Sequence, residues 1–249
     1  MLSVNPSMRY FIKFSYKGTH YHGWQIQPND ISVQSVLTDA MSLVFRFPVE
    51  LTGAGRTDAG VHALGMIAHF DTSEPITEPA KMVYKLNSLL PQDISVEDIF
   101  EVEETLHARF SAKSRTYKYY VSTKKSPFDD EFAARLTFPL DEYLMNQAAK
   151  VLFEYEDFTS FSKVHTDVKT NNCKIYHAQW ERVENHLIFT IKADRFLRNM
   201  VRAIVGTLIE VGKGAITIEE FRKIIESKNR CAAGMSVPAK GLFFVEAEY

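Results

Sequence analysis

The chain has 249 residues, 45% of them hydrophobic and 24% charged, with a formal net charge of -2. This composition suits a globular protein with one large core or two modest ones, and it argues against a uniformly basic nucleic-acid binder. The two cysteines have neither disulfide nor metal-ligand spacing, which favours the reducing cytoplasm. Residues 1–7 do not resemble a signal peptide, and no apolar window is long enough to span a bilayer. The sequence therefore predicts a soluble protein with no membrane association.

The first half of the chain predicts strands and helices in turn. Apolar and partly polar side chains alternate from Tyr10 to Tyr16, as they do in a strand. Apolar residues then recur at helical spacing from Val33 to Val44, behind Ser32 as a helix N-cap. The other elements predicted here are a strand at 47–52, a glycine-punctuated loop at 53–65, a strand at 66–71, a helix at 78–90 and a strand at 94–102.

The second half repeats this rhythm. It predicts a strand at 115–122, a helix at 141–155, strands at 174–183 and 186–192, and then helices, the last of which starts at a capping box of Thr217 and Glu220. Because regular βαβ alternation is missing, the pattern favours an α+β fold with a largely antiparallel sheet. We expect two halves, 1–105 and 106–249, that share an extended sheet and a cleft.

Charge is distributed unevenly along the chain. Six basic residues and no acidic one lie between Arg109 and Lys125, whereas residues 97–104 hold five acids and no base. A second basic stretch, from Lys192 to Arg202, could join the first in a phosphate-binding cleft. Two solvated faces with scattered charge are the alternative interpretation.

One segment concentrates candidate chemistry. In Gly53-Ala54-Gly55-Arg56-Thr57-Asp58-Ala59-Gly60-Val61-His62-Ala63, three glycines surround one carboxylate. Glycine lets a ligand approach the main chain closely, so the loop could hold Asp58 forward into a cleft. Taken alone, the segment also fits a turn with a capping aspartate.

The sequence of residues 55–63 resembles the catalytic motif of the tRNA pseudouridine synthase A family. Further family signatures follow in family order: Gly23-Trp24-Gln25, His107-Ala108-Arg109-Phe110-Ser111-Ala112, Tyr117-Lys118-Tyr119, Asn199-Met200-Val201-Arg202, and Pro238-Ala239 with Gly241-Leu242. The resemblance runs from about Arg9 to Tyr249. Two positions depart from it, since the family usually has glutamine at Met66 and often aspartate at Lys17.

This resemblance implies a pseudouridine synthase fold of two RRM-like, ferredoxin-like halves around a central cleft. It implies that Asp58 is the catalytic residue, by attack at C1′ or by removal of the 2′ proton, two routes that the sequence leaves open. Arg202 would pair with this carboxylate, the alternative being a solvated helix residue. Tyr117 would pack on the target base, the alternative being a core tyrosine. The reaction requires no metal, nucleotide or redox cofactor.

The resemblance also implies a tRNA substrate modified at positions 38–40 in the anticodon arm, and a homodimer. Arg56 is expected to hold phosphate and help extrude the nucleotide. The further candidate contacts to the RNA backbone are Lys113, Arg115, Lys118, Arg195 and Arg198.

Two other functions remain open at this point. The first is a noncatalytic RNA-binding protein of two RRM-like halves, which would not need Asp58. The second is a metal-dependent hydrolase that uses Asp58 with nearby histidines. No carboxylate cluster completes a ligand set beside His20 and His22 or beside His62 and His69, which disfavours a metal site.

Overall fold

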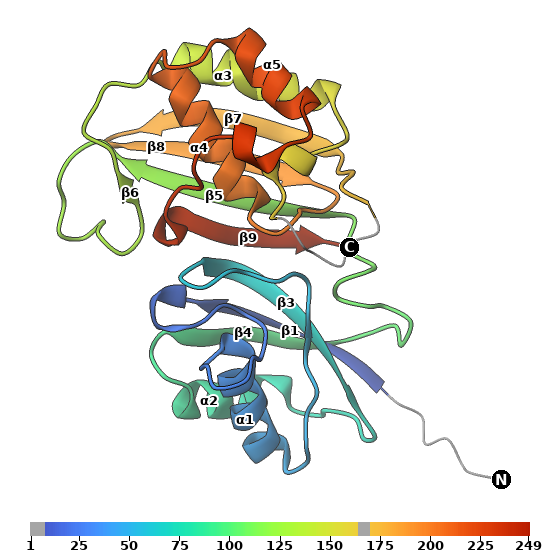
Figure 1. Cartoon of the computed structure of the whole chain (residues 1–249). Helices are drawn as coiled ribbons and strands as arrows, with labels where there is room; N and C mark the ends of the chain where they lie inside the picture. Colours follow the sequence, from blue (N-terminus) through green and yellow to red (C-terminus); the bar gives the residue numbers. More distant parts are fainter. Residues whose placement is uncertain (1–7, 164–169) are drawn as a thin grey trace. The chain divides into compact units, whose positions relative to one another are not determined.

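The computed structural model describes residues 8–163 and 170–249. Residues 1–7, which were considered above for a signal peptide, lie outside this part of the chain. The chain divides into two compact units, one of Met1–Lys113 with Phe244–Tyr249 and one of Ser114–Phe243. Figure 1 draws their elements in the colours of the sequence. None of the helices in the described residues is long and apolar enough to cross a membrane.

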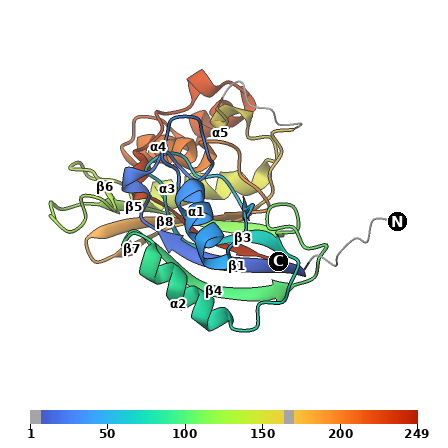
Figure 2. The same ribbon diagram turned by 90° about the horizontal axis from the view of Figure 1, so that it is seen from below.

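The sheet of the first unit is antiparallel, and its central strand pairs with a neighbour on each side (Figure 1). Helix α2 (Pro79–Leu89) packs along β4 (Ile94–Val102), and α1 (Val33–Phe45) packs beside α2 (Figure 2). The elements of this unit are β1 (Met8–Tyr16), η1 (Gly18–His20), α1 (Val33–Phe45), β2 (Thr52–Gly53), β3 (His62–Thr72), α2 (Pro79–Leu89) and β4 (Ile94–Val102). The strand order is β4-β1-β3, with β2 beside β3.

The central strand β1 is buried more fully than its alternation predicted. Tyr10, Ile12 and Phe14 are at most 2% exposed, as a core face requires. Phe11, which alternation assigns to the other face, is also only 1% exposed. It packs edge-on against Phe100 of β4 and lies 4.9 Å, ring to ring, from Tyr249. The last residue of the chain therefore helps to cover the second face of this sheet.

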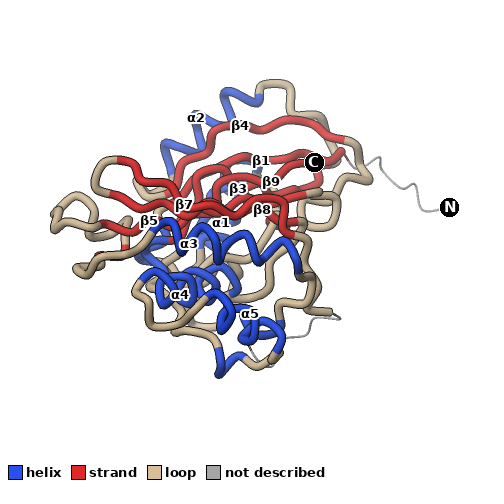
Figure 3. Tube along the Cα trace, turned by 90° about the horizontal axis from the view of Figure 1, so that it is seen from above, coloured by secondary structure: helices blue, strands red, loops and turns tan. Residues whose placement is uncertain are grey.

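In the second unit, three helices cover one face of its antiparallel strands (Figure 3). Its elements are β5 (Ser114–Ser122), β6 (Ala134–Arg135), α3 (Glu142–Val151), η2 (Leu152–Glu154), η3 (Thr159–Phe161), β7 (Ile175–Val183), β8 (His186–Ala193), α4 (Met200–Gly212), α5 (Ile218–Glu226), η4 (Arg230–Ala232) and η5 (Ala239–Gly241). The order is β5-β8-β7, and the short β6 pairs with β5 in parallel. The predicted α+β class with mostly antiparallel pairing is confirmed.

Side chains start two of the helices as the sequence predicted. Ser32 accepts a hydrogen bond from the Ser35 amide at 3.1 Å at the start of α1. At α5 the capping box is reciprocal, because Glu220 N–H donates to Thr217 Oγ1 and Thr217 N–H donates to Glu220 Oε2. Each bond satisfies an amide that the first helical turn leaves without a partner.

Replacing Thr217 by alanine is expected to lower the free energy of unfolding by about 1 kcal/mol, the usual loss when a capping hydroxyl is removed. Urea denaturation followed by circular dichroism measures the change. Thr137→Ala, at an exposed loop position of the same unit, is the matched control and should stay close to the parent. Equal effects of the two substitutions would contradict the capping role.

Two boundaries near residue 50 were predicted wrongly. The strand expected at 47–52 is confined to Thr52–Gly53. Side chains of α1 take up the backbone bonds that a strand would make, because Ser42 Oγ accepts from Val49 N–H and Gln34 donates to the Leu51 carbonyl. The loop expected to last until residue 65 ends earlier, since β3 already begins at His62.

The C-terminal strand β9 (Leu242–Glu248) was not predicted at all. Its first two residues belong to the second unit and the rest to the first. The segment after residue 105 also contacts the first unit, since Arg9 donates to the Leu106 carbonyl and Lys113 N–H donates to the Glu248 carbonyl. The units of the structure thus divide after Lys113, whereas the sequence placed the boundary near 105.

Candidate active site

Asp58 lies in the loop that joins β2 to β3 in the first unit. Its side chain is half-buried, between the exposed Arg56 and Ala59. The Val61 amide donates to the Asp58 main-chain carbonyl at 3.2 Å and closes a turn. Gly60 sits within this turn at a φ of 78°, a conformation that side chains other than glycine rarely adopt. The glycine at this position therefore lets the chain turn directly after the carboxylate.

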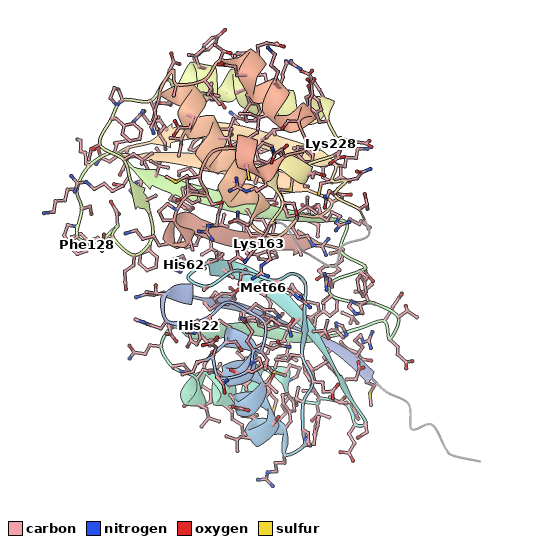
Figure 4. The ribbon with its side chains drawn as sticks, viewed as in Figure 1. His22, His62, Met66, Phe128, Lys163 and Lys228 are labelled. Carbon is pink, nitrogen blue, oxygen red and sulfur yellow. The ribbon has the colours of Figure 1, made fainter. Side chains whose placement is uncertain are left out.

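The two departures from the family pattern lie in the same unit. Figure 4 labels Met66 and His62, which both belong to β3. Met66 is fully buried and pairs in register with Phe14, so this position is part of the apolar core. The Lys17 amide donates to the Asp93 carbonyl at 2.9 Å, a backbone contact that aspartate at position 17 would also make.

In the second unit, Tyr117 lies on β5 with 8% of its surface exposed. Its ring meets the Phe196 ring edge-on, with centroids 5.1 Å apart. Two residues earlier on the same face, Arg115 donates to the Asp194 carbonyl at 2.7 Å. Both side chains therefore contact the segment between β8 and α4, which also carries Arg195 and Arg198.

Arg202 lies in the third position of α4 and is held by a loop from later in the chain. Its Nε donates to the Val237 carbonyl at 2.7 Å, and the Val237 amide donates back to the Arg202 carbonyl at 3.2 Å. Burial raises the pKa of Tyr119 on β5, and the nearby Arg202 charge opposes this rise. The guanidinium is thus near the β5 face that Tyr117 and Tyr119 share.

The other basic candidates are spread over both units. Lys113 is exposed in the first unit, as is Arg56. Lys118 lies one residue from Tyr117 on β5, so it points to the opposite face of that strand. Arg198 is exposed and Arg195 half-buried in the segment that precedes α4. The structure therefore brings Arg115 and Tyr117 to the segment that carries Arg195 and Arg198, and it places Lys118 on the other face of β5.

Comparison with known proteins decides the family. A family model described as tRNA pseudouridine synthase matches residues 13–111 and 148–249. The chain belongs to the tRNA pseudouridine synthase family. Proteins named tRNA pseudouridine synthase A from Bacteroides fragilis and Parabacteroides distasonis are each 58% identical over 97% of the chain and 96% of the relative. The one from Bacteroides thetaiotaomicron is also 58% identical, over 97% of the chain and 90% of that relative.

The tRNA pseudouridine synthase match includes some of the candidate residues and passes over others. Asp58, Arg56 and Arg202 lie in the two matched segments. Tyr117 lies between the segments, together with Lys113, Arg115 and Lys118. Strand β5, which carries Tyr117, is nevertheless central to the second unit because it pairs with both β8 and β6.

Sequence reasoning missed the contacts of Ser236, which directly precedes the Val237 that holds Arg202. Asn199 starts α4 at a φ of 66°, and its side chain donates to Ser236 Oγ at 2.6 Å. Arg230 donates to the same hydroxyl at 2.8 Å. The family signature Pro238-Ala239, directly after Val237, marks this segment as part of the family pattern. It does not indicate a contact with α4.

Two of the histidines considered for a metal site, His62 and His69, accept hydrogen bonds from backbone amides. His62 Nδ1 accepts from the Gly18 amide at 3.0 Å, and His69 Nδ1 accepts from the Ala108 amide at 3.2 Å. Across residues 8–163 and 170–249, no group of three His, Cys, Asp or Glu side chains is arranged to hold a metal ion.

His69 is expected to make the folded protein sensitive to acid. Burial, helped by the Arg9 charge and by His107, lowers its pKa from 6.5 to about 4. The folded state therefore binds this proton less readily than the unfolded chain does. The stability that neutral His69 contributes is complete above pH 6.5 and is lost as the pH falls towards 4, by up to about 3 kcal/mol.

Urea denaturation at a series of pH values tests this. His69→Asn keeps an acceptor for the Ala108 amide but does not titrate, so the fall in unfolding free energy between pH 6.5 and 4 should be smaller than in the parent. Thr137→Ala, the exposed loop control in the second unit, should leave this fall in unfolding free energy unchanged. If the unfolding free energy of His69→Asn fell between pH 6.5 and 4 as much as that of the parent, the prediction would be contradicted.

Proposed function

We propose that this chain isomerises uridine to pseudouridine at positions 38–40 of tRNA, in the anticodon stem-loop, with Asp58 as the catalytic carboxylate. Its family and its relatives support an isomerase that acts on tRNA. The observation that carries the role of Asp58 is its place directly before a glycine turn, half-buried between β2 and β3, in the loop whose sequence matches the catalytic motif of the family.

The proposed chemistry is a rearrangement within one nucleotide. The bond from N1 to C1′ breaks, the base turns, C5 bonds to C1′, the proton on C5 is released to solvent, and N1 takes up a proton. Both possible first steps need an electron-rich oxygen beside the ribose, which a carboxylate supplies. Because no external reagent is consumed, the proposal requires no metal, nucleotide or redox cofactor.

Residues of the second unit complete the proposed site. We propose that Arg202 pairs with Asp58 and that Tyr117 packs on the target base, where stacking contributes roughly 1 to 3 kcal/mol per base. The contact of Tyr117 with Phe196 supports a ring of fixed orientation. In this proposal the two units are the RRM-like halves of a pseudouridine synthase fold, with the substrate in a cleft that both halves line.

We assign the remaining basic side chains to the RNA backbone. Arg56, two residues before Asp58, would hold a phosphate and help to extrude the nucleotide. Arg195 and Arg198 belong to the segment between β8 and α4, and Arg115 donates to the Asp194 carbonyl of the same segment, which supports a shared phosphate contact near Tyr117. The proposal includes a homodimer that binds the anticodon arm in the cytoplasm, and size-exclusion chromatography tests the dimer.

The experiment is tritium release from tRNA labelled at C5 of uridine. The parent protein should release tritium. Each replacement of uridine by cytidine at position 38, 39 or 40 of the transcript should abolish the release from that position. RNA binding without release would favour a noncatalytic RNA-binding protein. Activity that EDTA abolishes would favour a metal-dependent enzyme, whereas the proposed reaction should be unaffected by the chelator.

A further inference from the structure

The segment from Tyr16 to Trp24, here called the strap, joins β1 to the region before α1 and lies against the Asp58 loop of the same unit. Four hydrogen bonds connect the strap with residues on both sides of Asp58. The catalytic motif alone gives no sign of these contacts, because their partners are about 40 residues apart in the sequence. They determine where the carboxylate can point.

On the upstream side, the strap holds Thr57 at two atoms. The Tyr16 hydroxyl and Thr57 Oγ1 are 2.7 Å apart in a buried hydrogen bond. The Trp24 amide donates to the Thr57 main-chain carbonyl at 3.2 Å. Since both the side chain and the backbone of Thr57 are fixed, the residue that directly precedes Asp58 has little freedom to rotate.

On the downstream side, the strap holds two residues that follow Asp58. The Gly60 amide donates to the Tyr21 carbonyl at 3.3 Å. The Gly18 amide donates to Nδ1 of His62, which is 1% exposed. This bond requires an unprotonated Nδ1 on His62. The loop is therefore fixed to the strap before and after the catalytic carboxylate.

Two glycines of the strap bring backbone against backbone. A Cβ on Gly18 would lie 2.0 Å from the Val61 carbonyl oxygen. A Cβ on Gly23, whose φ is 87°, would lie 2.4 Å from the Thr57 carbonyl oxygen. Any side chain at either position would push the strap away from the loop, so the close contact depends on glycine.

The strap is itself anchored to the rest of the unit. The Tyr21 hydroxyl donates to Asp93 Oδ1 at 2.6 Å, one residue before β4. At the other end, the Gly23 carbonyl accepts from the Val33 amide in the first turn of α1 at 3.2 Å. Because one anchor directly precedes β4 and the other is the first residue of α1, the strap can transmit the rigidity of the unit to the loop.

We propose that Tyr16 is a positioning residue for the isomerisation, which fixes the direction of the Asp58 carboxylate through Thr57. The inference rests on the proposed role of Asp58. Among the four bonds between the strap and the loop, the bond from Tyr16 to Thr57 is the one that removal of a single oxygen atom of the strap abolishes. A loop that is held less firmly spends less time with its carboxylate aligned to the ribose, and small misplacements reduce rates steeply.

Tyr16→Phe is expected to lower kcat for tritium release about 10-fold, less than the loss that a full ångström of misplacement can cause. KM for tRNA should change less than about 2-fold, because the hydroxyl is buried inside the unit. Thr57→Val should give the same fall in kcat. The double variant should be no slower than either single variant, since both remove one shared bond.

Tyr10→Phe is the matched control. Tyr10 lies on the same strand, is 2% exposed, and accepts a hydrogen bond from the Ile76 amide far from the loop in sequence. Its kcat should remain parental at a temperature where circular dichroism shows every variant folded. An equal fall in Tyr10→Phe and Tyr16→Phe would assign the loss to general stability and overturn the inference.

The outcomes separate this inference from the function on which it rests. Parental kcat in Tyr16→Phe with an inactive Asp58→Asn would overturn the positioning role and leave the proposed function intact. A rise in KM with unchanged kcat would also overturn it, because the hydroxyl would then act in RNA binding. An active Asp58→Asn would remove the proposed function and this inference together.

Discussion

Replacing Asp58 by asparagine is expected to reduce tritium release from C5-labelled tRNA by at least on the order of 1000-fold, as removal of a group that acts directly on the reacting atoms does. Asparagine has nearly the same shape, but its neutral amide is a poor nucleophile and a poor base. The turn should survive, because the Val61 amide bonds the main-chain carbonyl of residue 58. Single-turnover reactions with enzyme in excess measure the chemical step.

Asp39→Asn is the control for this substitution, since Asp39 is an exposed carboxylate on α1 of the same unit. It should keep the parental rate. Asp58→Asn should also bind tRNA with parental affinity in a filter-binding assay, which shows that the RNA site is intact. Retention of more than about a tenth of the parental rate in Asp58→Asn would exclude a direct role for this carboxylate.

Local patterns in the sequence predicted most elements because local physics determines them. The capping box of Thr217 and Glu220 involves residues three apart, and the strand at 94–102 has the bounds that its pattern predicted. The missed strand β9 has the opposite character. Its residues are divided between the two units, so its formation depends on partners far away in the sequence.

The candidate site shows the same division between local and distant information. Asp58 could be found because its motif is a continuous run of residues with a family resemblance. Tyr16 was only the last inward-facing residue of a strand pattern, and nothing local indicates its bond to Thr57. Val237 is 35 residues beyond Arg202 and contributes a backbone carbonyl, which sequence patterns do not mark.

The wrong strand at 47–52 has a related cause. Apolar residues there satisfy strand propensity, and Val49 and Leu51 are indeed buried. Their backbone groups, however, bond to Ser42 and Gln34 side chains of the preceding helix. The apolar side chains are therefore buried as they would be in a strand, whereas the choice of hydrogen-bond partner depended on how α1 packs.

Replacing Arg202 by alanine is expected to lower kcat about 100-fold, the usual loss when a charged or polar group that stabilises the transition state is removed. In the proposed site the guanidinium pairs with Asp58 and holds it for the reaction. Arg202→Lys keeps a positive charge but lacks the Nε that donates to Val237, so it should recover part of the rate. Steady-state tritium release measures both.

The pairing itself is tested by combining substitutions, because Asp58 and Arg202 belong to different units. If they act as one, Asp58→Asn with Arg202→Ala should be no slower than Asp58→Asn alone. Arg182→Ala, which removes an exposed ion pair with Glu142 in the second unit, should leave kcat unchanged. A parental kcat in a folded Arg202→Ala protein would mean that the arginine only ties α4 to the Val237 segment.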